Sequence, residues 1–230
     1  MGYFEKKKKF NEIVRDIQTI KIQGAKNIAR KALEAYILFP SKKSKKKLIS
    51  LRPTEPMLVN VLNEVEKISK KEVLEHFKSA QEKINLEVYK LIKDKDIIFT
   101  HCHSSSVTAS LIYSKTKKKD FEVYNTETRP LFQGRKTSKE LSKAKIKVTQ
   151  FVDSAMKIAL TKTQGTKKVK KIFLGADAIL EKGVINKVGS GMLSEIAEKN
   201  KIPLYIITDS WKYSKEAIKM EERNFKEVWE

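Results

Sequence analysis

Cysteine is almost absent from this sequence of 230 residues, since Cys102 is the single one. One cysteine excludes an internal disulfide and is typical of a protein in a reducing compartment. Long apolar runs are missing too. No window approaches the roughly 18 apolar residues that a membrane-spanning helix needs, and the first residues hold no apolar run of the secretory-signal kind. We therefore expect a cytoplasmic protein without a membrane partner.

Arginine is scarce as well, although the chain is strongly basic. The formal net charge is +21, yet only six of the 49 basic residues are arginine. A basic surface attracts polyanions such as nucleic acid or phosphorylated metabolites. However, lysine is mainly a hydrated, solubilising charge, whereas arginine makes most specific contacts with phosphates and bases. We do not expect a nucleic-acid partner, and we interpret the densest run, SKKSKKK at 41–47, as a solvated loop.

Helical periodicity covers the first 92 residues. Apolar residues recur at helical spacing over 4–20 and 25–39. A further helix is predicted after Thr54, which can cap it with Pro56 in the first turn. This helix and the next each carry an apolar stripe, formed by Leu58, Val61, Leu62, Val65 and Ile68 in one and by Leu74, Phe77, Ile84, Val88 and Leu91 in the other. We interpret these stripes as ordinary helix packing.

Short β-rich runs replace this pattern after residue 93. Each is followed by a polar turn and a helical stretch; the runs are DIIFT at 96, FEVYNT at 121, IKVTQFV at 146, KIFLG at 171 and PLYIIT at 203. Strands that alternate with helices predict a parallel sheet covered on both faces. Asp153 is placed to cap the helix after the third strand. The sequence thus predicts a helical domain over 1–92 and a doubly wound α/β domain over 93–230.

Three polar segments follow strands of this sheet. They are THCHSSS at 100–106, TETRPLFQG at 126–134 and GADAILEKGVINKVGSG at 175–191. Open parallel sheets bind ligands beyond the carboxyl ends of their strands. The third segment holds four of the eight glycines, which allow close backbone approach to a ligand, and a helix expected after Gly189 would direct its amino end at an anion. No GxGxxG motif follows the first strand, which argues against a dinucleotide cofactor. We predict no other cofactor either.

The first segment gathers Cys102 with two of the three histidines, and three interpretations are open. A metal site is disfavoured, because on a strand His101 and His103 would face away from Cys102 and no second ligand cluster exists. An active thiol is favoured by the strand end, where a helix start and an imidazolium would stabilise thiolate. A buried cysteine that acts as a small hydrophobe is the commonest outcome for this residue type.

Other polar side chains extend this candidate site. Asp177 follows an apolar strand between two alanines and is either a helix cap or an acid/base with a raised pKa. Glu127 and Arg129 are interpreted as an internal ion pair. Asn186 and Lys187 are predicted to bind an anion beside a glycine turn, with an exposed loop lysine as the alternative.

Seven segments, in order from Ile22 to Lys212, resemble one superfamily. It contains ribose 1,5-bisphosphate isomerase, methylthioribose-1-phosphate isomerase and the regulatory alpha, beta and delta subunits of translation initiation factor 2B. The segments are IQGAKNIARKA, LISLRPTEPMLVN, THCHSSS, TETRPLFQGRKTSKEL, VTQFVDSAM, GADAILEKGVINKVGS and IPLYIITDSWK. The resemblance implies a helical domain followed by a Rossmann-like doubly wound sheet, and a homo-oligomer that is a dimer or a hexamer.

The resemblance also implies roles for individual residues. A cysteine and an aspartate form the catalytic pair in the isomerases of this family, and these positions are Cys102 and Asp177 here. The implied substrate-binding positions are Gln23, Gly24, Arg52, Gln133, Asn186 and Lys187. In the isomerases an arginine that holds phosphate usually stands at the position of Gln23, so a neutral side chain replaces it here.

The segment HCHS is closer to ribose 1,5-bisphosphate isomerase than to methylthioribose-1-phosphate isomerase, which tends towards HCN. We therefore predict an aldose–ketose isomerase of a phosphorylated sugar, ribose 1,5-bisphosphate first of all, as in nucleotide salvage by archaeal relatives. The alternative is a regulatory subunit of the translation initiation factor 2B type, with translation factor 2 as its partner. The pair Cys102 and Asp177, commonly lost in such subunits, favours the enzyme, whereas Gln23 favours the alternative.

Overall fold

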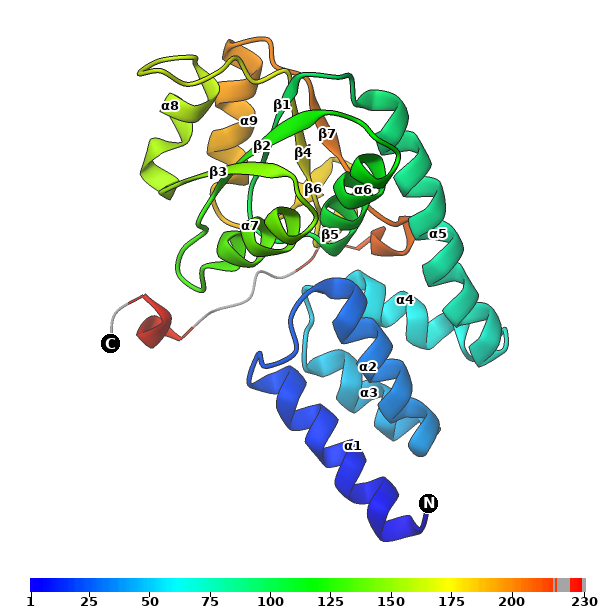
Figure 1. Cartoon of the computed structure of the whole chain (residues 1–230). Coiled ribbons are helices and arrows are strands. Elements are labelled where there is room, and N and C mark those ends of the chain that lie inside the picture. Colours follow the sequence, from blue (N-terminus) through cyan, green and yellow to red (C-terminus); the bar gives the residue numbers. More distant parts are fainter. Residues whose placement is uncertain (217, 219–223, 229–230) are drawn as a thin grey trace. The chain divides into compact units, whose positions relative to one another are not determined.

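The computed structural model describes residues 1–216, 218 and 224–228. Helices fill the first part of the chain, and strands alternate with helices afterwards (Figure 1). None of the helices in these described residues is long and apolar enough to cross a lipid bilayer.

Backbone contacts divide the chain into two compact units. The first unit contains 1–78 and two later segments, 177–185 and 210–222. The second unit contains 79–176, 186–209 and 223–230. The division into domains 1–92 and 93–230 stays a prediction, because compactness of the backbone does not by itself define a folding domain.

Apolar stripes hold the helices of the first unit together. These helices are α1 (Tyr3–Gln18), α2 (Ala25–Leu38), α3 (Lys42–Ser50), α4 (Pro56–Glu64) and the start of α5 (Lys70–Leu91). One buried cluster contains residues of α1, α2, α3 and α4, and a second contains residues of α2, α4 and α5. The predicted helices at 4–20 and 25–39 are confirmed. The predicted stripe on α5 is wrong at Leu74, which is 37% exposed, while its neighbour Val73 is buried.

The lysine-rich run at 41–47 forms most of α3 and is not the loop that was predicted. Ser41 is its N-cap, and its hydroxyl accepts the N–H of Ser44 at 3.2 Å. Leu48 is completely buried in the first apolar cluster, and Lys47 holds its ammonium 5.6 Å above an aromatic ring of α1. The run forms a helix because one leucine and the aliphatic lysine stems pack while the charged groups stay in water.

The turn before α4 differs from its prediction. Glu55, not Thr54, occupies the N-cap position, and it makes no side-chain cap hydrogen bond. Pro56 begins the helix as expected. The Glu55 carboxylate instead lies 3.4 Å from Nη2 of Arg52, and both side chains are buried. This turn therefore uses its acidic residue for a buried ion pair.

A five-stranded parallel sheet forms the centre of the second unit, with the strand order β3-β2-β1-β4-β7. The strands are β1 (Asp96–Thr100), β2 (Phe121–Thr126), β3 (Lys147–Phe151), β4 (Lys171–Leu174) and β7 (Leu204–Ile206). Their helices are α6 (Ser105–Thr116), α7 (Gln133–Lys143), α8 (Met156–Leu160) and α9 (Ser190–Lys199). The predicted doubly wound α/β fold is confirmed, and its strand order reverses between β1 and β4.

Alternate residues of the central strands enter two separate apolar layers. Ile98 and Phe173 pack with residues of α5, α6 and α7. Phe99 and Ile172 pack with residues of α8 and α9 (Figure 1). Because successive strand residues point to opposite faces, a strand that is buried on both faces must be apolar throughout. This is why short unbroken apolar runs predicted the sheet.

The segment after β4 begins with a hairpin, where the sequence predicted a polar turn leading to a helix. Strand β5 (Ala178–Leu180) pairs antiparallel with β6 (Gly183–Ile185), and both belong to the first unit. The N–H of Ser214 donates to the Ile179 carbonyl at 2.9 Å, which joins the hairpin to the late segment of that unit. The chain then returns to the second unit and begins α9 after Gly189, as predicted.

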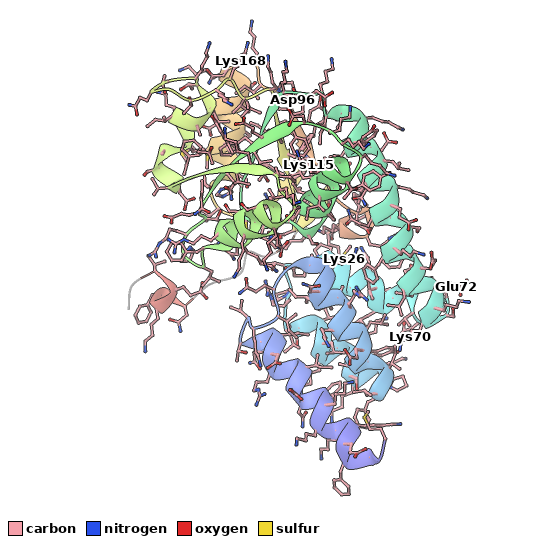
Figure 2. All side chains as sticks on the ribbon, in the orientation of Figure 1. Lys26, Lys70, Glu72, Asp96, Lys115 and Lys168 are labelled. Carbon is pink, nitrogen blue, oxygen red and sulfur yellow. The ribbon has the colours of Figure 1, made fainter. Side chains whose placement is uncertain are left out.

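A buried ion pair closes the amino end of the sheet. The Lys171 ammonium lies 2.6 Å from Oδ2 of Asp96 and also donates to the Leu91 carbonyl. The N–H of Lys93 donates to the same Asp96 oxygen at 2.8 Å. Asp96 lies at the start of β1, where Figure 2 labels it. The pair thus ties β1, β4 and the end of α5 together.

Candidate functional site

A left-handed turn places Cys102 at the carboxyl end of β1. Strand β1 ends at Thr100, so residues 101–103 are not part of a strand and the predicted alternation of their side chains does not apply. Cys102 has a φ of 67° and is half-buried. A β-carbon strains this conformation, which is uncommon outside glycine. The residue lies beside the reversal of strand order, which is where open α/β sheets bind ligands.

Two threonine hydroxyls bond to the backbone of Cys102. Its N–H donates to Oγ1 of Thr128 at 3.0 Å. Its carbonyl accepts the hydroxyl of Thr137 at 2.9 Å, and Nδ1 of His103 contacts the same hydroxyl at 3.0 Å. Thr128 and Thr137 are both almost fully buried. Both polar backbone groups of the strained residue are therefore satisfied by side chains from other segments.

The imidazole of His101 is buried and neutral. Its Nε2–H donates to the Val188 carbonyl at 2.8 Å, because a carbonyl cannot donate, and its Nδ1 accepts the hydroxyl of Thr126. Burial lowers the pKa of His101 from its ordinary value. Burial, followed by the charge of Lys136, also lowers the pKa of His103. Desolvation thus favours the uncharged rings and disfavours the imidazolium that was predicted beside the thiol.

The turn before α9 packs against the imidazole ring of His101. Gly189 has a φ of 96°, and a β-carbon there would lie 3.1 Å from Nε2 of His101. Within the turn, the side-chain N–H of Asn186 donates to Oγ of Ser190 at 2.9 Å, and that hydroxyl donates to the Lys187 carbonyl at 2.7 Å. Asn186 and Lys187 are thus held at the same end of the sheet as Cys102.

Gln133 is the first residue of α7, and its side-chain oxygen makes no hydrogen bond within the described part of the chain. Its Oε1 is buried, and no hydrogen-bond partner for it exists among the described residues. The next residue must be glycine, because a β-carbon on Gly134 would lie 1.8 Å from the Thr126 carbonyl. The start of α7 is therefore pressed against the end of β2. A buried amide oxygen without a partner is a group that a bound polar ligand would satisfy.

The sequence predicted that Asp153 caps the helix after β3, but in the structure Asp153 does not cap α8. Its carboxylate accepts the N–H of Thr128 at 2.9 Å and the N–H of Arg129 at 2.6 Å, while Val152 holds the N-cap position of the short helix that begins at Asp153. The side chain is therefore used to hold the loop after β2. That loop carries Thr128, one of the two hydroxyls on Cys102.

The predicted ion pair of Glu127 with Arg129 is also wrong. Glu127 pairs with Arg135 at 2.7 Å. Arg129 and Arg135 both place their guanidinium groups against the ring of Phe132, at 4.8 and 3.7 Å from its centre. Helix α7 brings Arg135 within reach of Glu127, a proximity that neighbouring positions in the sequence do not reveal.

Three of the predicted substrate-binding residues belong to the first unit. Arg52 is buried beside Glu55, as described above. Gln23 is exposed and its carbonyl accepts the side-chain N–H of Asn27 at 3.3 Å. Gly24, with a φ of 82°, is the N-cap residue of α2. No β-carbon clash requires this glycine, but its positive φ favours one.

Asp177 also belongs to the first unit and is half-buried. It precedes β5, and its N–H donates to the Ile185 carbonyl at 2.8 Å. The helix-cap alternative is therefore wrong, because a strand and not a helix follows. The second unit carries Cys102, Gln133, Asn186 and Lys187. That the residues of both units form one site stays a prediction.

Three side chains of this region, those of Thr126, Thr128 and Thr137, were not predicted to take part, and Asp153 was predicted in another role, as a helix cap. Threonine is a common residue, and its type alone does not indicate a role in a site. The only signal for Thr126 and Thr128 was that both lie in a polar segment at the end of a strand. Across the described ranges, no three His, Cys, Asp or Glu side chains are grouped as a metal ion would require. The carboxyl end of β1 is instead surrounded by hydroxyl and neutral imidazole groups.

Known proteins resemble the chain in both sequence and fold. The profile of the Initiation factor 2 subunit family matches residues 21–229. A ribose 1,5-bisphosphate isomerase from Archaeoglobus fulgidus is 32% identical over 94% of this chain and 77% of its own length. One from Methanocaldococcus jannaschii is 32% identical over 94% and 79%. The predicted resemblance is confirmed, and the predicted enzyme agrees with these names.

Solved structures show the same fold. The translation initiation factor eIF-2B of Pyrococcus horikoshii superposes with a TM-score of 0.78 at 24% identity, over 89% of this chain and 79% of that one. A Pyrococcus furiosus relative, named as a protein like eIF-2B subunit 2, is 26% identical over 88% of this chain and 78% of its own length.

Proposed function

Because the chain belongs to the Initiation factor 2 subunit family, we propose that it is an aldose–ketose isomerase that converts ribose 1,5-bisphosphate into ribulose 1,5-bisphosphate. One observation carries the proposal. The only thiol of the chain is fixed in a strained turn where the strand order reverses. Relatives named ribose 1,5-bisphosphate isomerase add the substrate. A positioned thiol is suited to proton transfer to and from carbon in a bound sugar.

The reaction requires two proton-transferring groups, because phosphate on the anomeric carbon prevents spontaneous ring opening. Asp177 gives a proton to the ring oxygen as the bond between that oxygen and C1 breaks. The thiolate of Cys102 takes the proton from C2, and these electrons form a C1–C2 double bond. Cys102 then returns the proton to C1 while Asp177 takes the proton of the C2 hydroxyl, which becomes the carbonyl. Each group ends as it began, so the reaction is an isomerisation.

The remaining predicted residues bind the substrate in this proposal. Arg52 binds a phosphate, and Glu55 beside it holds the guanidinium in place. Gln133 meets a sugar hydroxyl with its buried Oε1. Asn186 and Lys187 bind the sugar and its phosphate from the turn that His101 supports. Gln23 and Gly24 approach a phosphate through the start of α2, with a neutral side chain in the first position.

The chain forms a homo-oligomer in this proposal, as its family resemblance implies. Light scattering of the purified chain measures the number of copies.

A second candidate function is that of a regulatory subunit related to translation initiation factor 2B. Two observations favour it: the neutral Gln23 at the start of α2, and the Pyrococcus furiosus relative with a translation-factor name. In this case the chain binds a phosphorylated ligand and translation factor 2 without turning the ligand over.

The test is turnover of ribose 1,5-bisphosphate by the purified full chain, followed by phosphorus NMR. We expect ribulose 1,5-bisphosphate to appear. Because each group supplies general acid–base catalysis, Cys102→Ser and Asp177→Asn should each lower kcat by roughly 10²- to 10⁴-fold. Circular dichroism of each variant checks that the fold is intact.

Normal turnover by Cys102→Ser would remove the thiol from the mechanism. Absence of turnover by the parent chain, together with co-purification on translation factor 2, would establish the regulatory alternative. Turnover of methylthioribose 1-phosphate in place of ribose 1,5-bisphosphate would keep the isomerase and correct its substrate.

A further inference from the structure

We propose that Thr128 and Thr137 are positioning residues, which hold Cys102 in its left-handed conformation and thereby keep its thiol in one orientation. The proposal rests on the proposed function in one respect, that the thiol takes part in the reaction. It goes beyond that function because neither threonine is implied by the resemblance or by the names of relatives.

The first step of the argument is the conformation of Cys102. A φ of 67° brings the β-carbon of an L-residue close to its own backbone, so an isolated chain would leave this conformation for an extended or right-handed one. The direction of the Cα–Cβ bond changes with that backbone rotation. The position of Sγ therefore depends on whatever keeps the backbone left-handed.

The second step is that two bonds hold the residue from opposite sides of its α-carbon. The N–H of Cys102 donates to Oγ1 of Thr128 at 3.0 Å, and its carbonyl accepts the hydroxyl of Thr137 at 2.9 Å. One threonine comes from the loop after β2 and the other from α7. A rotation of φ or ψ at Cys102 would break at least one of these two bonds, so each bond opposes departure from the left-handed conformation.

The third step is that Thr128 is itself held in place. Its N–H donates to Oδ1 of Asp153 at 2.9 Å, and its hydroxyl is 3.3 Å from the Thr126 carbonyl, to which it donates. Thr128 is completely buried and has a φ of 64°. The hydroxyl that accepts the Cys102 N–H is therefore fixed through a chain of bonds that ends on the Asp153 carboxylate.

The experiment compares Thr128→Val and Thr137→Val, which remove one hydroxyl each at nearly constant volume, with Thr108→Val as the matched control. Thr108 is also buried, and its hydroxyl has no hydrogen-bond partner among the described residues. With ribose 1,5-bisphosphate we expect kcat to fall by about 10- to 100-fold in the two test variants, as for a misplaced catalytic group. We expect KM to change by less than about threefold, because substrate contacts remain.

Two readouts report on Cys102 whether or not the chain is an isomerase. With ¹⁵N-cysteine labelling the chain contains one labelled residue, so its single amide signal reports directly on the bond to Thr128. We expect its hydrogen exchange to accelerate at least about tenfold in Thr128→Val. The pH profile of alkylation by iodoacetamide should move towards that of the urea-unfolded chain in both test variants, and it should stay at the parent profile in Thr108→Val.

Thr128→Ser and Thr137→Ser keep the hydroxyls and should restore the parent behaviour. If a valine variant does not fold, the alanine and serine variants of the same position replace it, since they also differ by the hydroxyl. Parent-like amide exchange and alkylation in folded Thr128→Val and Thr137→Val would overturn the proposal. Lack of isomerase activity in the parent chain, with altered exchange and alkylation in these variants, would reject the function and keep the positioning role.

Discussion

The two ends of the parallel sheet are built from different chemistry. At the amino end, the charged groups of Asp96 and Lys171 are buried 2.6 Å apart. At the carboxyl end, the groups around Cys102 include buried threonine hydroxyls, the buried imidazole of His101 and the half-buried imidazole of His103, and burial lowers the pKa of both rings. One end is held by a buried pair of charges. At the other end the side chains that bond to the Cys102 backbone are uncharged hydroxyls, and one of them belongs to a loop that the Asp153 carboxylate holds.

This difference separates stability from activity. A buried charge pair tolerates little change, because loss of one partner leaves the other charge in a poorly solvating interior. Single hydrogen bonds between neutral groups contribute less each, but several of them can fix the orientation of one strained residue. The amino end therefore sets how firmly the strands are held, and the carboxyl end sets where the thiol of Cys102 points.

The largest expected effect follows from changing Asp96 to Asn. The substitution leaves the Lys171 ammonium buried without its counter-charge, which costs roughly 3–5 kcal/mol of the free energy of unfolding. We expect kcat of the folded protein to stay within about twofold of the parent, because this end of the sheet lies opposite Cys102. Urea unfolding and the phosphorus NMR assay measure the two quantities.

Glu87→Gln is the control for this prediction. It removes a charge from an ion pair with Lys90 in which both side chains are mostly exposed, and it should change the free energy of unfolding by less than about 0.5 kcal/mol. A strong loss of kcat in Asp96→Asn with unchanged stability would contradict the separation of the two ends.

The next largest effect is the change in stability when either of two glycines at the carboxyl end of the sheet is replaced by alanine. Gly134 and Gly191 are each the second residue of a helix, so helix propensity alone favours alanine at both by up to about 1 kcal/mol. At Gly191 no atom would meet the new β-carbon within 4 Å, whereas at Gly134 it would lie 1.8 Å from the Thr126 carbonyl. We expect Gly191→Ala to stabilise the chain slightly and Gly134→Ala to destabilise it by about 1–3 kcal/mol.

Thermal and urea unfolding of both variants measure this pair. The signs of the two changes should be opposite. Equal stabilisation by the two substitutions would mean that α7 does not press against the end of β2 in solution.

The smallest effect concerns the pH dependence of stability. Burial depresses the pKa of His101 in the folded chain, with opposing influences of Asp153 and Lys187. Between the depressed folded pKa and the unfolded value, which is near 6.5, the unfolded chain takes up this proton more readily than the folded chain. Stability is therefore fully present above the unfolded pKa and falls as the pH drops through this range. One such proton contributes at most about 1.4 kcal/mol per pH unit.

His101→Gln should reduce this slope, because its amide can donate to the Val188 carbonyl but does not titrate. Urea unfolding at pH 5, 6 and 7 measures the difference between the two chains. His103 contributes equally to both, and glutamates with lowered pKa lose their contribution only as pH falls below about 4.5. An unchanged slope would mean that His101 is charged, or exposed, in the folded chain.

Much of the fold was predictable, because local patterns carry it. The run from Ile97 to Phe99 is apolar throughout, as expected of a strand buried on both faces, and Leu58, Val61 and Leu62 lie one helical turn apart. The prediction failed where composition and packing disagree. The lysines at 41–47 belong to a helix because Leu48 anchors it in the core, and no charge pattern contains that information.

The candidate site was predictable only in part. The family segments pointed to Cys102, Asp177 and the substrate-binding residues. Asp153 was predicted to cap a helix, whereas its carboxylate accepts two N–H groups from the loop after β2. Its partners are 24 and 25 residues away in the chain, a distance over which no spacing rule operates.

The sequence by itself determined the order along the chain of the parallel strands and of most helices, the layers they build and the family of the chain, because each depends on periodicity or on short segments that stay together. Only the tertiary structure decided the left-handed turn at Cys102, the neutral state of His101 and His103, and the threonines that hold the turn. These depend on groups that folding brings within 3 Å of one another and on the water that folding removes around them, and neither is written in the local order of residues.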